Sequence, residues 1–392
     1  MAKTDTIFSS YERNPSLYDE IFDEQGEVTR VYKKLFKLYG KNSIANYVEL
    51  NNKAKASFFN QGITFQVYSE EATREKIFPF DMFPRIIGAS EWGHIEKGSS
   101  QRCRALNLFL KDIYSEKQII KDGVIPLELI NSSENYIEKM VGMEPPGGIY
   151  NHISGTDIIR HKDGEFYVLE DNIRCPSGVS YVLSNRNALK RAFFGVFNDY
   201  GVRTVTNYAE NLLDKLEEVK PHGVDLPNTV VLTPGMYNSA FYEHSYLAKT
   251  MGVQLVEGRD LFVENDFVYM KTIDGPQRVD IIYRRIDDLF LDPLEFREDS
   301  ALGVPGLFAA YKKRNVTIAN APGTGVADDK AVYTYVPEII RYYLGEEPIL
   351  KNVHTYHCSR KEEREYVLEN IRELVVKPVD EAGGYGTVSY TH

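Results

Sequence analysis

Residues 156–172 read TDIIRHKDGEFYVLEDN and have the pattern of a β-hairpin. Two strand-like runs flank Asp163-Gly164, a dipeptide that favours two-residue hairpin turns. With this pair at the centre of the turn, Asp157 faces Glu170 across the hairpin. Asn172 lies two residues beyond Glu170 and shares its face, because side chains alternate along a strand. The segment therefore predicts two carboxylates and one amide on one face of a hairpin.

Two carboxylates that face each other across a hairpin repel, so this arrangement indicates a bound cation. Mg²⁺ prefers oxygen ligands and commonly joins carboxylates to phosphates. Asp157, Glu170 and Asn172 are therefore candidate Mg²⁺ ligands. A solvated hairpin face is the alternative, since Asp and Glu are mostly exposed. Ile159 and Val168 are expected to share the face, and an apolar surrounding favours a partner for the charges.

Two further segments combine a lysine with glycines, which suits phosphate binding. Lys377 ends a predicted strand and precedes Gly383-Gly384-Tyr385-Gly386, while Lys330 follows the small and turn-forming residues 320–325. Glycines let backbone N–H groups approach phosphates, and a lysine adds a point charge. Neither segment matches the phosphate loop G-x-x-x-x-G-K-[ST]. An ordinary turn and an acidic first turn of a helix remain the respective alternatives.

Arginines occur in two notable places. Arg284 and Arg285 end an apolar strand and are followed by Asp287 and Asp288. Salt bridges are the more common explanation, and a clamp for phosphate or carboxylate is the alternative that the planar guanidinium suits. For Arg102, in a predicted helix at 90–114, a structural role is favoured. The histidines are isolated, and no serine or cysteine nucleophile has a partner near it in sequence.

Composition narrows the function classes. The 392 residues suggest two or three domains, and 46 basic against 57 acidic residues give a net charge of −11. This balance disfavours a nucleic-acid partner. The three cysteines are far apart and match neither a zinc site nor a disulfide framework, which favours a reducing cytoplasm. The first residues lack a signal peptide, and no apolar run is long enough for a membrane span.

The order of predicted elements gives the fold class. Residues 1–75 are predicted to be mostly helical, with apolar positions at helical spacing over 28–38 and 44–58. Residues 225–300 predict a β-α-β subdomain with strands at 229–232, 253–256 and 279–283. Its helix covers 239–251 and ends at Gly252. Alternating strands and helices of this kind predict an α/β (α+β) fold with a doubly wound subdomain.

Taken together, these residues resemble the circularly permuted ATP-grasp family, type 2, related to glutathionylspermidine synthetase. The resemblance covers about residues 78–386. In ordinary ATP-grasp enzymes the nucleotide lysines and the glycine loop precede the metal ligands, whereas here they follow them, as a circular permutation produces. The pieces that carry it are FDMFPR at 80–85, LEDN at 169–172 with PSG at 176–178, LTPG at 232–235, YRRIDD at 283–288, residues 320–330, and Lys377-Pro378 with the glycine loop.

The resemblance implies an ATP- and Mg²⁺-dependent ligase that joins a small-molecule or peptide carboxylate to an amine through an acyl phosphate. From the charge balance and the lack of a long apolar run, no nucleic-acid or membrane partner is expected. Asp157, Glu170 and Asn172 would hold Mg²⁺, and Lys330 and Lys377 would contact ATP. The remaining implied site residues are Gly383, Gly384 and Gly386 over the phosphates, and Arg160, Arg284 and Arg285 as contacts to anionic substrate or transition state.

The expected organisation is a helical region at 1–75 and a circularly permuted ATP-grasp core at 76–392, with the nucleotide-binding part at 315–392. Relatives continue past the glycine loop, so this part is expected to be truncated. The glycine loop should return along a neighbouring strand, for which the last six residues suffice. Two other functions fit the same motifs: a non-catalytic protein that binds nucleotide or a partner, and a phosphotransferase.

Overall fold

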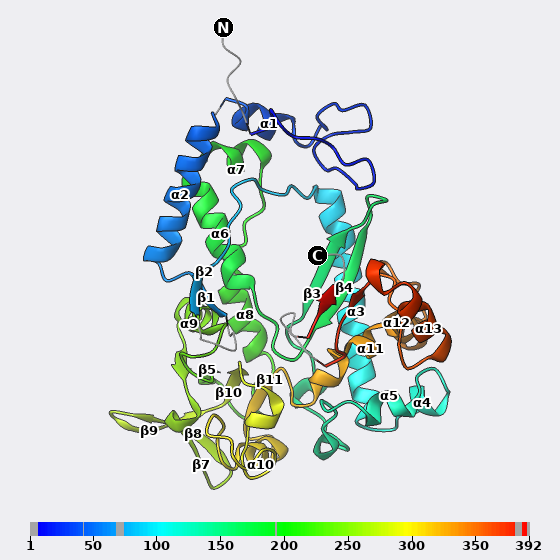
Figure 1. Cartoon of the computed structure of the whole chain (residues 1–392). Helices are drawn as coiled ribbons and strands as arrows, with labels where there is room; N and C mark the ends of the chain where they lie inside the picture. Colours follow the sequence, from blue (N-terminus) through cyan, green and yellow to red (C-terminus); the bar gives the residue numbers. More distant parts are fainter. Residues whose placement is uncertain (1–6, 42, 68–73, 193, 381–385, 390–392) are drawn as a thin grey trace.

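The computed structural model describes residues 7–41, 43–67, 74–192, 194–380 and 386–389. Helices and several small sheets share one mixed α/β fold, as predicted (Figure 1). Helix α2 stands beside α6 on the left of the view, and α3 stands with the β3–β4 hairpin on the right. Within the described residues, no helix combines the length and the apolar character that crossing a membrane requires.

The N-terminal region is only partly helical. Helix α2 (Ile44–Asn60) confirms the helix predicted at 44–58, and the Ser43 side chain caps it by accepting the Asn46 N–H at 3.2 Å. Helix α1 (Lys33–Tyr39) begins later than predicted. The helical prediction is wrong near residue 65, where β1 (Thr64–Val67) pairs antiparallel with β2 (Arg74–Ile77). Gly62, with φ of +64°, follows α2 and turns the chain into β1.

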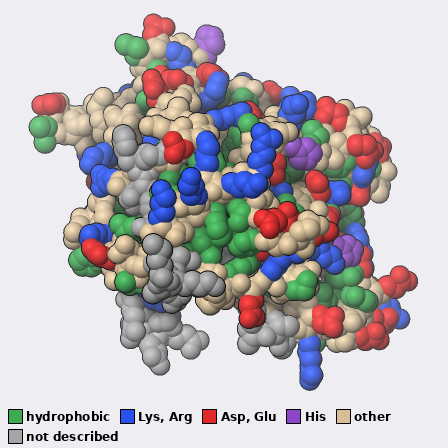
Figure 2. All heavy atoms as spheres, turned by 90° about the horizontal axis from the view of Figure 1, so that it is seen from above, with side chains coloured by type: hydrophobic (Ala, Val, Ile, Leu, Met, Phe, Trp, Pro, Cys, Tyr) green, Lys and Arg blue, Asp and Glu red, His purple; other side chains and the backbone are tan. Residues whose placement is uncertain are grey.

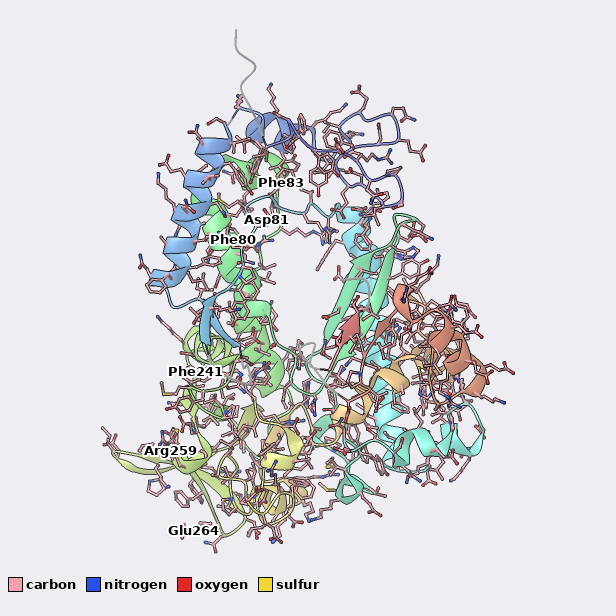
Figure 3. The ribbon with its side chains drawn as sticks, viewed as in Figure 1. Phe80, Asp81, Phe83, Phe241, Arg259 and Glu264 are labelled. Carbon is pink, nitrogen blue, oxygen red and sulfur yellow. The ribbon has the colours of Figure 1, made fainter. Side chains whose placement is uncertain are left out.

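The segment between β2 and α3 fixes the N-terminal region to the rest of the protein. Phe80, Asp81 and Phe83 lie along it in the upper half of the molecule (Figure 3). Asp81 accepts hydrogen bonds from the Tyr47 hydroxyl at 3.2 Å and the Phe83 N–H at 2.8 Å. The aromatic rings around it pack into a cluster with α1 and α2. The FDMFPR motif thus connects the N-terminal region to α3 and packs against α1 and α2.

Helix α3 (Ala89–Ile113) confirms the long helix predicted at 90–114 and buries one face in the largest core cluster. It packs against α12 (Val336–Leu344). Leu350, in the segment after α12, also lies close to α3, and a Cβ atom at Gly98 would be only 2.4 Å from its Cγ atom. Only glycine permits that approach. The other helices are α4 (Gln118–Lys121), α5 (Leu127–Asn131), α6 (Val179–Ala192), α7 (Phe194–Tyr200), α8 (Tyr208–Glu217), α9 (Phe241–Met251), α10 (Leu307–Lys312), α11 (Lys330–Tyr333) and α13 (Lys361–Glu369).

A parallel sheet confirms the predicted β-α-β subdomain. Strands β5 (Thr229–Leu232), β6 (Gln254–Val256), β10 (Ile281–Arg284) and β11 (Thr317–Ala319) form it in the order β11-β10-β5-β6. Helix α9 connects β5 to β6 and ends at Gly252 in the left-handed conformation, with φ of +75°. All residues of β5, β10 and β11 are buried, as expected for parallel strands covered on both faces.

The remaining sheets are small and mostly antiparallel. Strands β7 (Leu261–Glu264), β8 (Phe267–Thr272) and β9 (Gly275–Val279) form a meander. The hairpin of β3 (Gly155–Arg160) and β4 (Phe166–Asn172) is extended by the parallel strand β12 (Lys351–Asn352). Strands β13 (Val375–Val376) and β14 (Val388–Ser389) pair antiparallel, which confirms that the chain returns after the glycine loop.

The surface seen from above is not uniformly acidic, although the net charge is −11. Figure 2 shows Lys and Arg side chains gathered around an area of hydrophobic side chains on this face.

Candidate active site

The β3–β4 hairpin brings the candidate metal ligands together. Asp157 pairs with Glu170, and Asn172 pairs with Gly155, so the predicted pairing of the two carboxylates is confirmed. The predicted turn is wrong by one residue. The Gly164 N–H donates to the His161 carbonyl oxygen at 2.9 Å, which makes Lys162 and Asp163 the central residues, and Gly164 follows with φ of +84°. A bulge between Asp157 and Ile158 restores the expected register.

The bulge also changes which side chains share a face. Ile158 pairs with Val168, and both belong to a small buried cluster with Phe166. Val168 therefore lies on the face opposite Glu170, and the expectation that it borders the carboxylates is wrong. The extra residue in β4 reverses the alternation, so that Val168 and Asp171 point into the protein. Ile159, two residues from Asp157 on the same strand, remains on the carboxylate face.

Two lysines from distant parts of the chain lie near one carboxylate. Lys330, the first residue of α11, has its Nζ 3.7 Å from Glu170 Oε2, and Lys377, just after β13, has its Nζ 3.9 Å from the same atom. The side chains are between 20% and 31% exposed, so a ligand can reach them. The two predicted nucleotide lysines and a predicted metal ligand thus form one site.

The carboxylate pair has the electrostatics of a cation site. Burial, together with the charge of Glu170 and a hydrogen bond to it, raises the pKa of Asp157, while Lys377 opposes the shift. A bound Mg²⁺ would offset the part of this pKa shift that comes from the charge of Glu170. Asn172 Nδ2 donates to the Gly155 carbonyl oxygen at 3.1 Å, which orients the amide. In the described ranges, no group of three or more Asp, Glu, His or Cys side chains is placed to hold a metal ion, so a site at this carboxylate pair needs a ligand of another type, for which Asn172 is the candidate.

Buried polar side chains position the hairpin over the parallel sheet. Asn320, directly after β11, accepts from the N–H groups of His152 and Ile153 at 2.7 and 2.9 Å. Its Nδ2 donates to the carbonyl oxygens of Ile153 and Ile173, both at 2.7 Å. One amide side chain therefore binds the residues before β3 and after β4. Sequence reasoning placed residue 320 in a turn and missed this role, because only the folded chain brings these segments together.

Asp328 was also missed as a site-supporting residue. Its carboxylate accepts hydrogen bonds from the backbone N–H groups of Ile173 and Arg174, and Arg174 Nε lies 3.6 Å away. Burial raises the pKa of Asp328 to about 7, although Arg174 and the two N–H groups favour its charged form. The residue ties the segment before α11 to the end of β4, and so fixes Lys330 relative to Glu170. The sequence signal was its position two residues before Lys330.

Arg284 and Arg285 form buried networks, which is the salt-bridge alternative. Arg284 is fully buried, donates to the carbonyl oxygens of three residues and lies 2.9 Å from Asp288. Arg285 donates to the Pro176 carbonyl oxygen at 2.6 Å and pairs with Glu243 at 3.2 Å. These contacts hold the loop after β4 against the sheet. A direct contact of either arginine with substrate stays a prediction.

Arg160 lies apart from the metal candidates. It ends β3 on the same face as Ile158, opposite Asp157. Its guanidinium pairs with Glu91 at 2.8 Å and stacks on the rings of Tyr18 and Phe166 at 4.7 and 4.5 Å. The predicted contact with an anion therefore has a different location, and its catalytic role stays a prediction.

The structure describes only part of the glycine loop. Gly383 and Gly384 lie outside the described residues. Gly386 has φ of +64°, and a Cβ atom there would lie 2.7 Å from Pro378 Cγ. Both features require glycine at this position. The β13–β14 pair brings the two ends of the loop together beside Lys377.

A buried histidine makes stability depend on pH. His244 is 2% exposed, and its Nδ1 lies 2.8 Å from Thr233 Oγ1. Burial, with a smaller contribution from Arg285, lowers its pKa from 6.5 to about 2. The unfolded chain therefore takes up the proton first, so the contribution to stability is complete above about pH 6.5 and is lost as the pH falls.

We expect the free energy of unfolding to fall by up to about 1.4 kcal/mol per pH unit below pH 6.5 because of His244. Urea unfolding at a series of pH values measures this slope. His244→Gln should be less steep than the parent, whereas His222→Gln, at an exposed position, should keep the parent slope. Equal slopes in the two variants would show that His244 is not the group responsible.

The chain is similar in sequence to one protein family and to several bacterial proteins. The profile described as circularly permuted ATP-grasp type 2 matches residues 84–392. The chain is 49% identical over 371 residues to an uncharacterized protein of Synechocystis, covering 95% of this chain and 77% of that protein. It is 50% identical over 374 residues to an uncharacterized protein of Mycobacterium tuberculosis, covering 95% and 67%.

More distant matches carry functional names. A protein of Frankia alni, provisionally named a glutamate–cysteine ligase, is 38% identical over 381 residues, which cover 96% of this chain and 44% of that protein. Among solved structures, a glutathione synthetase-like effector of Globodera pallida in its apo form aligns with a TM-score of 0.44 and 14% identity. The alignment covers 83% of this chain and 77% of the effector.

Proposed function

Because the chain belongs to the circularly permuted ATP-grasp type 2 family, we propose that it is an ATP- and Mg²⁺-dependent carboxylate–amine ligase. The observation that supports this most is the convergence of Lys330 and Lys377 on Glu170, opposite Asp157. Cationic side chains beside paired carboxylates are what phosphoryl transfer from a metal-bound nucleotide requires.

In this proposal Asp157, Glu170 and Asn172 hold Mg²⁺, which neutralises charge on the phosphates when it is bound. Lys330 and Lys377 place positive charge beside the nucleotide phosphates. The γ-phosphoryl group passes to a substrate carboxylate oxygen, giving an acyl phosphate and ADP. The nitrogen of an amine then attacks the acyl carbon, phosphate leaves, and the nitrogen loses a proton. Positioning and electrostatics supply the catalysis, so no side-chain nucleophile is needed.

Amino acids are the first substrates to examine. The related Frankia alni protein carries the provisional name of a glutamate–cysteine ligase, and that reaction joins the carboxylate of one amino acid to the amine of another. We therefore propose an amino acid as at least one of the two substrates of this chain.

The two lysines give a direct test of the nucleotide site. Lys330→Ala and Lys377→Ala should each weaken Mg²⁺–ATP binding by about tenfold, because each removes a charge-assisted contact to phosphate. Calorimetric titration measures the affinity. Lys361→Ala, which removes an exposed lysine of α13, serves as the matched control. Parent-like affinity in both site variants would remove the lysines from the nucleotide site.

A further inference from the structure

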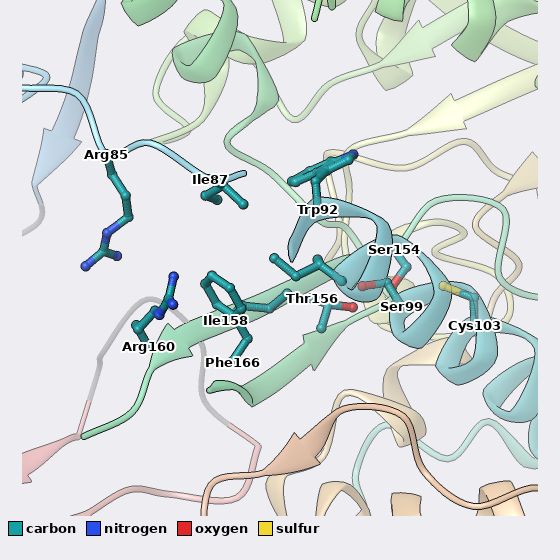
Figure 4. Close-up of a pocket in the computed structure, with 11 residues that line it drawn as sticks. Arg85, Ile87, Trp92, Ser99, Cys103, Ser154, Thr156, Ile158, Arg160 and Phe166 are labelled. Carbon is teal, nitrogen blue, oxygen red and sulfur yellow. The ribbon is translucent and has the colours of Figure 1, made fainter. Parts of the chain in front are cut away.

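A cavity of about 300 Å³ lies on the far side of the hairpin from Asp157 and Glu170. Its walls are the segment 85–87, the face of α3 that carries Trp92 and Ser99, and the face of β3 that carries Thr156 and Ile158. Figure 4 shows Arg85 and Arg160 at one end, and Ser99, Ser154 and Cys103 at the other. The cavity is therefore a place distinct from the carboxylate face.

Two arginines lie at the charged end of the cavity, and each also pairs with a glutamate outside the lining. Arg85 and Arg160 point toward each other there, and none of the described residues that line the cavity is Asp or Glu (Figure 4). Arg85 pairs through Nε with Glu20 at 2.9 Å, and its terminal nitrogens have no hydrogen-bond partner in the described part of the chain. The Arg160 side chain is only 13% exposed, lies against the Tyr18 and Phe166 rings, and has a partner at each nitrogen. Its Nη1 pairs with Glu91, its Nε donates to the Gly164 carbonyl oxygen at 2.6 Å, and its Nη2 donates to the Tyr18 hydroxyl at 3.4 Å. The Arg85 side chain is 61% exposed, so its terminal N–H groups are open to a ligand, and a guanidinium of this kind beside the fixed charge of Arg160 suits a carboxylate.

The rest of the wall is largely apolar. Ile87, Trp92, Ile95, Ile158 and Phe166 line it. Trp92 is 45% exposed and Ile87 is 37% exposed, although both are large hydrophobic side chains beside a cavity. Apolar walls with a few convergent polar groups are typical of small-molecule sites. Burial of the Trp92 indole would stabilise a complex with an apolar ligand.

We propose that this cavity binds a small organic carboxylate with an aromatic or branched apolar body. The carboxylate lies between Arg85 and Arg160, and the apolar body lies against Trp92, Ile87 and Phe166. Because the cavity and the carboxylate face lie on opposite sides of β3, this site goes beyond the ligase reaction and needs neither ATP nor Mg²⁺. It also gives Arg160 an anion to contact at the place where the structure puts it.

The fluorescence of Trp92 can report binding at this site, because Trp92 is the only tryptophan in the chain. Phenylacetate is the probe, and phenylacetamide is a neutral control of nearly the same shape. Selective excitation of tryptophan in the full chain, without nucleotide or metal, should show a saturable change with phenylacetate. Phenylacetamide should bind at least about tenfold more weakly, because it cannot form the charged contacts.

Two arginine variants separate the charged contact from general effects. Arg85→Gln should weaken phenylacetate binding about fivefold, since it removes one partly exposed charge. Arg104→Gln, on the same helix as Trp92 but outside the cavity, should bind as the parent does. Ser99→Leu, which fills the cavity, should abolish the fluorescence response while the circular dichroism spectrum stays unchanged.

Three results would overturn the proposal: equal affinity for phenylacetate and phenylacetamide, no saturable change at Trp92, or parent-like binding by Arg85→Gln. Because the assay contains no ATP, these results are independent of whether the chain is a ligase.

Discussion

Replacing Asp171 by alanine is expected to lower the free energy of unfolding by about 3–5 kcal/mol. Asp171 and Arg102 form an ion pair in which both side chains are 1% exposed. Arg102 also donates to Asn352 Oδ1 at 2.8 Å, and the Thr156 hydroxyl donates to Asp171 at 3.2 Å. The pair thus joins α3, both strands of the hairpin and β12. Alanine would leave a buried guanidinium without its counter-charge, which is the costly outcome.

An exposed ion pair between Arg104 of α3 and Glu346 serves as the comparison for the loss of stability. Arg104 and Glu346 lie 3.3 Å apart, with side chains 56% and 42% exposed. Glu346→Ala should cost less than about 1 kcal/mol, because solvent screens such pairs. Urea unfolding of parent and variants measures both effects. The double change Arg102→Met with Asp171→Leu should recover much of the lost stability, since it leaves no unpaired charge. Similar losses in Asp171→Ala and Glu346→Ala would contradict the structural role.

Replacing Glu170 by alanine is expected to remove most of the stabilisation that Mg²⁺–ATP gives the protein. A ligand at 100 times its dissociation constant stabilises by about 2.7 kcal/mol, and a hundredfold weaker ligand stabilises by only about 0.4 kcal/mol. Glu170 lies opposite Asp157 and near both lysines, so its loss affects metal and nucleotide together. Without ligand, the change should be within about 1 kcal/mol, because relief of repulsion from Asp157 offsets the lost lysine contacts.

Thermal melts with and without Mg²⁺–ATP measure this difference. Glu165→Gln, at an exposed position on the same hairpin, should keep the full stabilisation. Equal stabilisation of the parent and Glu170→Ala would remove Glu170 from the metal site. Omitting Mg²⁺ while keeping ATP should bring the parent close to the variant.

The sequence predicted local patterns well and tertiary contacts poorly. The long helix α3, the β-α-β unit and the pairing of Asp157 with Glu170 follow from residue spacing. The last of these was right although the turn was misplaced, because the bulge before Ile158 compensates for the shift of one residue. A bulge depends on how the strand packs, which spacing does not reveal. For this reason Val168 was assigned to the wrong face.

The residues that position the site could not be predicted for a related reason. Asn320, Asp328 and Asp171 act on segments that are between 15 and 168 residues away in sequence. Each is a short polar side chain in a segment with ordinary turn or strand character. Only the folded chain shows that Asn320 and Asp171 are buried, that the Asp328 side chain is 17% exposed, and that the partners of all three include backbone groups or a buried arginine. The resemblance of the motifs to a known family predicted the site residues, whereas their support is a property of the three-dimensional structure.

The measurement that tests the ligase proposal most directly is capture of the acyl phosphate by hydroxylamine. The protein is incubated with ATP, Mg²⁺, hydroxylamine and single carboxylates, beginning with glutamate and other amino acids, and both hydroxamate and ADP are measured. Hydroxylamine replaces the unidentified amine, so only the carboxylate must be found. We predict hydroxamate in equal amount to ADP for at least one carboxylate, and none with Glu170→Ala. ADP release without hydroxamate, or a stable phosphorylated product in its place, would contradict the proposed function.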